Sequence, residues 1–275
     1  MLSDLWWTYQ PVIDSLGVNA LLGLSMYLVL ATGQLSLGSA AFMGLGAYAA
    51  GLLGTLTALP FWLVLPLACL PPAVFALVIG PPTLRLSGVY LAIATIGLGE
   101  VLRALYMRAD ITGGALGLSG IPTRGSTFLV YAVLAVVLFA LLRLQRSATG
   151  RRMEAVRQDA VAAGTCGIAV ARLRLLALIG SAVLAGLAGA LGADRTGFIG
   201  PNEYGFEPAV TILSFALLGG IETPFGPVLG AAVLTLLPEL LRGVADLRMV
   251  VNGLVIVAAV LFLPRGLLPL RARRA

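Results

Sequence analysis

The sequence predicts an all-α fold: a polytopic bundle of about eight to nine transmembrane helices, some of them broken or re-entrant. The 275 residues are 59% hydrophobic and 11% charged, with a mean hydropathy of +1.01, whereas soluble domains carry about 25% charged residues. Apolar runs such as 128–142 do not alternate with polar residues, as the strands of a membrane barrel would. Each crossing needs about 20 mostly apolar residues, so we expect residues 1–275 to form one transmembrane domain.

Apolar segments separated by glycine, proline or charge are the candidate spans. In chain order they cover residues 16–32, 39–59, 61–79, 89–106, 128–142, 175–193, 209–218, 228–241 and 249–263. The segment 209–218 is too short to cross comfortably, so we expect it to be tilted, extended or re-entrant. Gly33, Gly38, Gly44 and Gly46 crowd the second segment and predict a broken or closely packed central helix, because glycine permits close helix contacts.

The arginines predict the topology. Seven lie between Arg143 and Arg174 and four follow Pro264, and an excess of arginine in short loops marks the cytoplasmic side of a membrane protein. Both regions are therefore expected inside, the N-terminus and the connection 108–127 outside, and the C-terminus inside. These clusters indicate orientation and contact with membrane lipid, not nucleic acid binding.

Several chemistries are excluded by residues that the chain lacks. There is no histidine, and all 18 basic residues are arginine. Without lysine the chain cannot hold a P-loop ATPase site, and without histidine the usual catalytic triads and zinc sites lack a member. We expect no enzyme activity, metal site or cofactor. The spacing of Cys69 and Cys166 supports no disulfide, and we expect both to be buried as small hydrophobic residues.

The polar loop, residues 144–174, predicts a helix outside the bilayer. Met153, Val156 and Ala160 recur at helical spacing among polar residues, which indicates a short amphipathic helix that ends at Gly164 or Gly167. The alternative is a loop whose arginines only orient the protein.

Within this loop, Ala162, Ala163 and Gly167 form an Ala-Ala pair that is followed by three intervening residues and then Gly. This pattern resembles the coupling motif of ATP-binding-cassette (ABC) importer permeases. The resemblance implies a coupling helix that docks on a cytoplasmic ATPase subunit, with Arg157 and Asp159 beside the motif. Val161 departs from the family, where many members have Glu.

Four further stretches narrow the resemblance. They are TGQLSLGSAAFMGLGAYAAGLL from Thr32, LSGVYLAIATIGLGEVLR from Leu86, TGGALGLSGIP from Thr112 and LLGGIETPFGPVLGA from Leu217. Together they resemble the permeases of branched-chain amino-acid ABC importers, in order, over nearly the whole chain. Ser39 and Glu222 depart from the residues His and Gly that the family often has there.

The resemblance implies a permease subunit of the bacterial or archaeal cytoplasmic membrane that works by alternating access. Its implied partners are cytoplasmic ABC ATPase subunits, a second related permease and an extracytoplasmic solute-binding protein. The glycine-rich loop 112–122 would be a gate or a landing surface for that protein, or only a flexible connection. Alternative functions are an ion-coupled secondary transporter and an ABC permease for urea or short amides.

Polar residues inside the apolar segments are the candidate pathway or gate residues. Gln34, Ser36 and Thr95 could bind a passing zwitterion, although such residues often join neighbouring helices instead. Glu100 is an ionisable residue in an apolar segment, which is by default a candidate functional site. Arg103 lies one helical turn later, so a structural ion pair between the two is the favoured interpretation.

Overall fold

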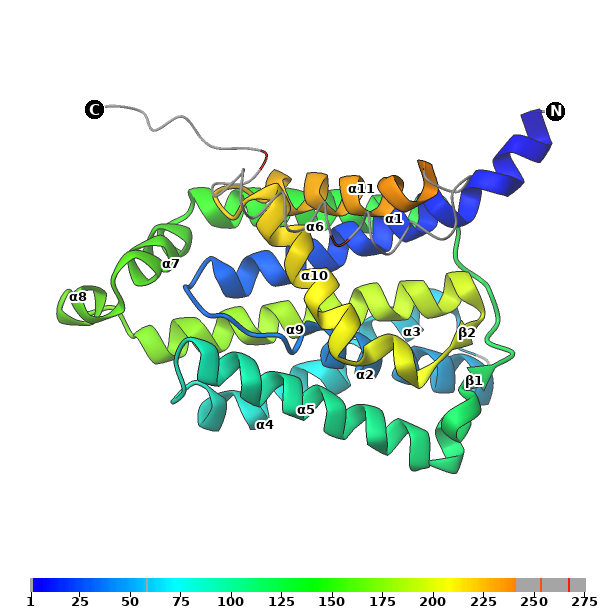
Figure 1. The fold of residues 1–275 in the computed structure, drawn as a ribbon, viewed down its shortest axis with the longest axis horizontal. Helices are drawn as coiled ribbons and strands as arrows, with labels where there is room; N and C mark the ends of the chain where they lie inside the picture. Colours follow the sequence, from blue (N-terminus) through cyan, green and yellow to red (C-terminus); the bar gives the residue numbers. More distant parts are fainter. Residues whose placement is uncertain (1, 58, 241–252, 254–266, 268–275) are drawn as a thin grey trace.

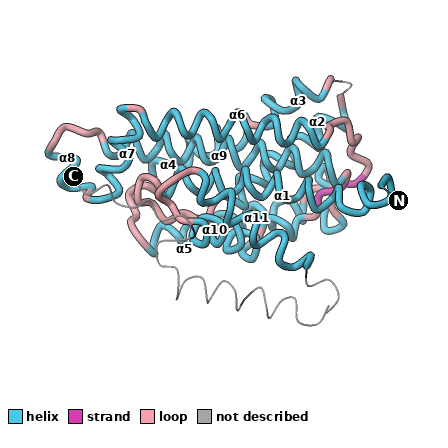
Figure 2. Tube along the Cα trace, turned by 90° about the horizontal axis from the view of Figure 1, so that it is seen from above, coloured by secondary structure: helices cyan, strands magenta, loops and turns pink. Residues whose placement is uncertain are grey.

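The computed structural model describes residues 2–57, 59–240, 253 and 267 of the chain. Most of its long helices run side by side, as Figure 1 shows. Two short helices, α7 and α8, project from one end of this bundle, and the two-stranded sheet lies near the opposite end (Figure 2). We call these the proximal end and the distal end.

The long elements of the bundle follow the predicted apolar segments. They are α1 (Leu2–Leu30), α2 (Ser39–Leu56), α3 (Phe61–Ala68), α4 (Leu70–Thr83), α5 (Val89–Arg108), α6 (Thr127–Arg146), α9 (Val170–Thr196), α10 (Phe206–Gly219) and α11 (Phe225–Leu240). The short elements are α7 (Ala148–Gln158), α8 (Ala160–Thr165), η1 (Asp110–Thr112), η2 (Gly114–Leu116), η3 (Pro201–Tyr204), β1 (Leu118–Ser119) and β2 (Phe198–Ile199). The strands pair antiparallel, with Leu118 opposite Ile199.

Six helices of the described part are long and apolar enough to cross a membrane, and α10 and α11 are shorter apolar helices. The predicted all-α membrane bundle is confirmed. Eight of the predicted segments fall on these helices, whereas 249–263 and the arginine-rich tail lie outside the described residues. A count of eight to nine full crossings therefore stays a prediction.

The span that contains α3 and α4 bends at Cys69. Leu70 is followed by Pro71 and Pro72, which have no N–H to donate to the preceding turn. Loss of these backbone hydrogen bonds is a common cause of a helix kink. One predicted span is therefore built from two helical pieces.

The connection between α1 and α2 is not helical and turns back toward the middle of the bundle (Figure 1). Gly33 begins it with a φ of +71°, a backbone conformation that favours glycine. The backbone N–H of Leu37 donates to Thr95 Oγ1 at 2.9 Å, and Thr95 lies about 9 Å along α5 from its first residue at a rise of about 1.5 Å per residue. The connection thus enters the bundle, whereas the second predicted segment forms one continuous helix, α2, and is not broken. We call residues 32–38 the re-entrant connection.

The glycines of α2 serve close contact with α9. A Cβ atom added at Gly46 would lie 2.2 Å from the carbonyl oxygen of Gly186, and one added at Gly189 would lie 2.1 Å from that of Met43. Only glycine leaves room for the two backbones to approach so closely. The predicted close packing of a central helix is confirmed.

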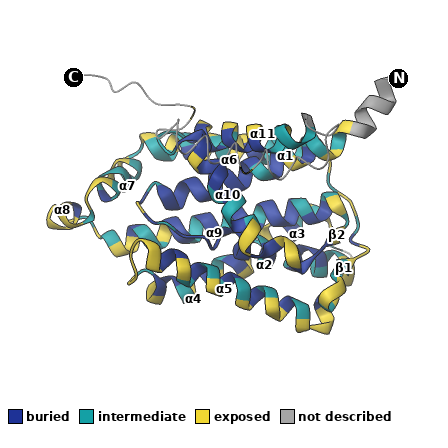
Figure 3. Cartoon of the chain, in the orientation of Figure 1, coloured by how far each residue is buried: buried dark blue, intermediate teal, exposed yellow. Residues whose placement is uncertain are grey.

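The short helix α10 crosses the long helices obliquely in Figure 1 and packs against α11. This contact also uses glycine, because a Cβ at Gly219 would lie 1.8 Å from the Gly226 carbonyl oxygen and one at Gly230 would lie 2.0 Å from that of Phe215. The tilt expected for this short segment is confirmed. Figure 3 shows that α1, α2 and α9 are largely buried, whereas α4, α5 and α6 carry many exposed residues.

Candidate functional site

The helical projection, residues 148–165, consists of two helices that meet at Asp159. The Ser147 hydroxyl accepts a hydrogen bond from the Gly150 N–H and caps α7. The Asp159 carboxylate accepts hydrogen bonds from the N–H groups of Val161 at 2.8 Å and Ala162 at 3.0 Å, which caps α8. The prediction of one amphipathic helix ending at Gly164 or Gly167 is therefore wrong, since an N-cap carboxylate starts a second helix after α7.

One face of α7 packs on the bundle. Met153 and Val156 are buried, as the helical spacing predicted, and Ala160 is half-buried in α8. Arg157 forms an ion pair with Glu154 at 2.7 Å on the flank of α7. Helix α7 therefore has a buried apolar face and a polar outer face.

The face of α8 that points away from the bundle is apolar and uncovered. Val161 is 79% exposed, Ala162 is exposed, and only Ala163 turns inward, with 5% exposure. Gly167 follows α8 with a φ of +80°, and a Cβ there would meet no atom within 4 Å. Of the small residues in the motif, Ala162 and Gly167 are accessible and Ala163 is not.

The two cysteines differ in burial. Cys166 at the end of α8 is exposed and Cys69 is half-buried, and both are free thiols. The expectation that Cys166 is buried is wrong, because α8 stands away from the apolar bundle.

The projection contacts the re-entrant connection directly. A Cβ added at Gly33 would lie 3.3 Å from the Cα atom of Arg157 in α7. The side-chain amide of Gln34 donates to the Arg174 carbonyl oxygen at 3.1 Å, just after the chain returns from the projection into α9. The connection between α1 and α2 therefore lies close to both α7 and the first turns of α9.

The three predicted pathway residues are buried, and each forms a hydrogen bond to a residue of this connection. Thr95 Oγ1 accepts from Leu37 N–H, Ser36 Oγ accepts from Gly38 N–H at 3.4 Å, and Gln34 Nε2 donates to Thr32 Oγ1 at 2.7 Å. Gln34 and Thr95 line two separate small cavities. Their observed contacts are with the chain's own backbone and side chains, which is the alternative noted for polar residues in membrane helices.

Glu100 forms the predicted ion pair and a second contact. Arg103 Nε donates to Glu100 Oε2 at 2.7 Å, and the backbone N–H of Phe206 donates to Glu100 Oε1 at 3.0 Å. Phe206 is the first residue of α10, so a carboxylate from α5 caps this helix and favours the positive end of its dipole. The structure thus gives Glu100 a structural partner at each oxygen.

Two large cavities lie toward opposite ends of α1. The proximal cavity has a volume of about 870 Å³ and is bordered by α1, α6, α7 and the loop before α11, including Tyr27, Gln145 and Arg157. The distal cavity has a volume of about 770 Å³ and is bordered by α1, α2, α9 and η3, including Asn19, Met43 and Glu203. Both have sizes typical of small-molecule sites.

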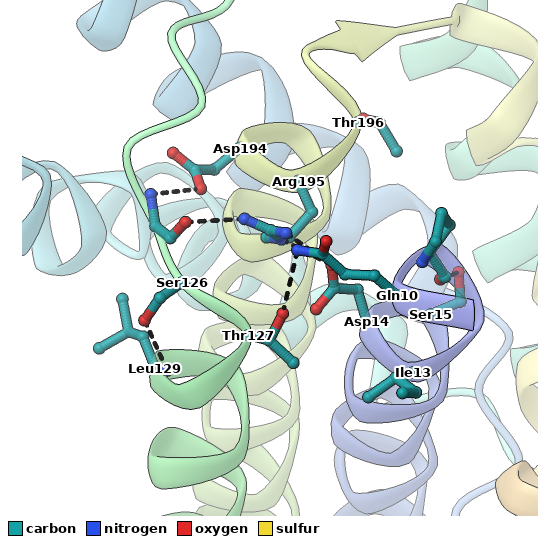
Figure 4. Close-up of polar contacts among 12 residues, drawn as sticks. Gln10, Ile13, Asp14, Ser15, Ser126, Thr127, Leu129, Asp194, Arg195 and Thr196 are labelled. Atoms are coloured by element: carbon teal, nitrogen blue, oxygen red, sulfur yellow. Dashed lines mark hydrogen bonds and ion pairs between the residues drawn. The ribbon is translucent and has the colours of Figure 1, made fainter. Parts of the chain in front are cut away.

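A polar cluster at the edge of the distal cavity joins α1, α9 and the loop before α6 (Figure 4). Arg195 pairs with Asp14 at 2.8 Å and donates to the Gly125 carbonyl oxygen at 2.7 Å. The Asp194 carboxylate accepts from the backbone N–H groups of Arg124 at 2.9 Å and Gly125 at 2.8 Å. Sequence reasoning did not identify Asp14, Asp194 or Arg195 as a site. The available signal was the adjacent charged pair Asp194 and Arg195, which directly follows the apolar segment 175–193.

Tyr204, which lines the distal cavity, packs in a cluster with two further tyrosines. The rings of Tyr48 and Tyr106 stack with centroids 4.3 Å apart, and Tyr204 meets Tyr48 edge to face at 5.9 Å. Gly44 makes room for them, because a Cβ there would lie 2.9 Å from the Tyr204 ring. Burial raises the pKa of the Tyr204 phenol well above its ordinary value, so this side chain stays neutral.

Among the described residues, no group of three acidic or cysteine side chains is arranged to hold a metal ion. The broken-helix bundle and its polar helical projection define a multi-pass membrane protein. Residues 12–260 match the family described as "Branched-chain amino acid transport system / permease component". The chain therefore belongs to this permease family.

Curated relatives support the assignment. The high-affinity branched-chain amino acid transport system permease protein LivM of Salmonella typhimurium strain LT2 is 35% identical over 294 residues, covering 94% of this chain and 68% of the relative. LivM of Escherichia coli strain K12 gives the same values. The autoinducer 2 import system permease protein LsrC of Enterobacter sp. strain 638 is 32% identical over 254 residues, covering 83% of this chain and 69% of the relative. No solved structure matches the chain significantly.

Proposed function

We propose that the chain is the membrane-spanning permease subunit of an ABC importer and moves branched-chain amino acids or similar small solutes by alternating access. The observation that carries this proposal is the helical projection, whose uncovered α8 stands apart from the membrane bundle while α7 rests on the re-entrant connection. In this arrangement α7 joins the proposed docking surface on α8 to the non-helical connection between α1 and α2. The family and the two LivM relatives support the choice of solute.

In this proposal the proximal end faces the cytoplasm, the N-terminus lies outside and the C-terminus inside. Cytoplasmic ABC ATPase subunits dock on Val161, Ala162 and Gly167, while Ala163 holds α8 in place. Arg157 and Asp159 shape the projection as an ion-pair partner and a helix cap. The distal end receives an extracytoplasmic solute-binding protein, and a second related permease completes the membrane part.

The exposed thiol of Cys166 allows a direct test of docking. Binding of the ATPase subunit should slow the reaction of Cys166 with a maleimide at least tenfold, because the thiol lies beside the proposed contact. Cys69, half-buried in the membrane bundle, is an internal reference, and the Cys166→Ser variant identifies the signal. Unchanged Cys166 reactivity in a complex shown to contain bound ATPase would place the docking surface elsewhere.

A matched pair of variants refines this test. Ala162→Trp adds bulk on the exposed face of α8 and should weaken ATPase binding without preventing membrane insertion. Ala163→Trp adds the same bulk where the side chain is 5% exposed, so it should also disturb the seat of α8 itself. Equal ATPase binding by Ala162→Trp and the wild type would contradict the assignment of this face.

Transport in proteoliposomes distinguishes the proposed function from an ion-coupled secondary transporter. We expect uptake of leucine, isoleucine or valine only when the ATPase subunits, the second permease, the binding protein and ATP are all present. Uptake driven by an ion gradient through this chain alone would refute the proposal. Glu100, the intramembrane acid that would favour ion coupling, has structural partners at both oxygens.

The solute is tested separately, because the family also includes relatives named for autoinducer 2 import. Thermal stabilisation of the cognate binding protein should be largest with branched-chain amino acids. Stabilisation by urea or a short amide instead would keep the ABC permease function and change its solute. This measurement uses the binding protein, to which solute capture is delegated in the proposal.

A further inference from the structure

We propose that Gln34 is a positioning residue that transmits movement of the helical projection to the re-entrant connection, and that it does so through a small hydrated cavity shared with Arg174. The inference rests on the proposed function, since it assigns a role in coupling ATP hydrolysis to solute movement. It changes the interpretation of Gln34 from a solute contact to a mechanical link.

Gln34 joins two segments that are far apart in the sequence. Its side chain is buried, with 3% exposure, and its amide nitrogen donates to Thr32 Oγ1 at 2.7 Å and to the Arg174 carbonyl oxygen at 3.1 Å. Thr32 lies at the end of α1, whereas Arg174 lies in the first turns of α9 after the projection. One side chain therefore ties the return from the projection to the start of the re-entrant connection.

The neighbouring residue, Gly33, lies close to α7 in the middle of the projection. Gly33 lies against the backbone of Arg157, with an added Cβ only 3.3 Å from Arg157 Cα and 3.5 Å from its carbonyl oxygen. Consecutive residues, Gly33 and Gln34, thus touch the chain where α7 ends and where α9 begins. A shift of the projection reaches the re-entrant connection through two adjacent contacts.

Gln34 and Arg174 also share an unsatisfied cavity. Gln34 Oε1, an acceptor, and Arg174 Nε, a donor, are both buried without a hydrogen-bond partner. Both residues line a cavity of about 40 Å³, together with Ser87 and Gly88 in the turn before α5. A water needs about 10–15 Å³ of such space and two to four polar partners. The structure thus assigns an ordered water that bridges Gln34, Arg174 and the turn before α5.

The orientation of the Gln34 amide follows from its contacts. If the amide were rotated by half a turn, its oxygen would face the Arg174 carbonyl oxygen, which has no hydrogen to donate. The amide nitrogen therefore faces the Arg174 carbonyl oxygen, and Oε1 is the atom left without a partner. Three residues further on, Leu37 N–H is bonded to Thr95 on α5, so displacement of Gln34 is carried to α5 and to the start of α2.

The test uses the complete transporter in proteoliposomes, with ATPase subunits, second permease and binding protein. Gln34→Met keeps the length of the side chain and removes both its donor and its acceptor. We expect the number of solutes transported per ATP hydrolysed to fall at least fivefold, while ATP hydrolysis without solute stays within twofold of the wild type. A merely structural role would lower uptake and hydrolysis together and leave their ratio unchanged.

The matched control is Thr83→Val, which removes a different buried polar group, a hydroxyl, without changing the contacts of Gln34. Thr83 bonds only to carbonyls of its own helix, so its ratio should remain that of the wild type. Gly33→Ala is the second test variant, because it keeps the Gln34 side chain while its Cβ meets Arg157 and strains the backbone at a φ of +71°. It should also lower the number of solutes transported per ATP hydrolysed. If Gln34→Met fails to assemble, this variant provides the test.

The outcomes separate the two proposals. Absence of ATP-dependent uptake by the wild type refutes the proposed function. Normal wild-type uptake with an unchanged ratio in the assembled variants refutes the role of Gln34 and leaves the proposed function intact. An equal loss in Thr83→Val also refutes it, because the effect would then follow any lost buried polar group.

Discussion

Replacement of Gly46 by alanine is expected to force α2 and α9 apart. A Cβ atom at this position would lie 2.2 Å from the oxygen, 2.4 Å from the Cα and 2.5 Å from the carbonyl carbon of Gly186. Carbon atoms pack best at about 3.5–4.0 Å, so the helices must separate by about 1 Å. Both contacting groups are helix backbone, which cannot rotate away as a side chain can. We expect overpacking to cost about 1–3 kcal/mol.

Gly97→Ala is the matched control, because Gly97 also lies inside a helix and a Cβ there would meet no atom within 4 Å. Alanine should stabilise that helix by about 0.5–1 kcal/mol. In detergent, each kcal/mol shifts the thermal midpoint by about 2–4 °C for a chain near this size. Gly46→Ala should therefore unfold at least several degrees below Gly97→Ala. Equal midpoints would refute the close contact between α2 and α9.

Two further predictions concern the ends of helices. Glu100→Ala should destabilise the start of α10 by about 0.5–2 kcal/mol, because the Phe206 N–H loses its acceptor. Hydrogen exchange at Phe206 should accelerate more than in Arg103→Ala, which keeps the cap, and equal rates would contradict the capping role. Asp194→Ala should accelerate exchange at the Arg124 and Gly125 amides, which lose their carboxylate acceptor. Unchanged protection of these two amides would show that other contacts hold the loop.

Local sequence patterns predicted most of the helices because the burial of apolar runs in lipid is a local property. Gly33 lies at the start of the connection between α1 and α2 with a positive φ, a requirement of a single position that a local pattern can reveal. The division between α7 and α8 was missed although Asp159 carries the signal. An Asp followed by small and apolar residues is a recognisable N-cap, and helical periodicity alone does not reveal the interruption.

The candidate site was less predictable because its polar partners lie far apart in the sequence. Asp14 and Arg195 meet only after α1 and α9 pack together, and Gln34 meets Arg174 in the same way. A single sequence shows each group alone, where a solute contact and a helix-to-helix hydrogen bond have the same appearance. Glu100 and Arg103 were paired correctly because their spacing places them one turn apart on one helix.

The two large cavities lie on opposite sides of α1. The distal cavity touches α1 at Val18 and the proximal cavity touches it at Tyr27, about two and a half turns later and therefore on the opposite side of the helix. Leu21 and Leu24 between them are fully buried. A solute that moves from one cavity to the other along this chain needs α1 to shift against its neighbours.

A shift of α1 would have to change two contacts, one toward each end of the helix. Arg195 holds Asp14 at the distal end, and Arg157 of the projection rests on Gly33 just beyond the proximal end. In the proposed cycle the ATPase acts on the second contact, because it belongs to the docking element. Opening of the distal cavity then requires the first contact to break. In the proposed alternating-access cycle, the contacts at the two ends of this buried helix would therefore compete with each other.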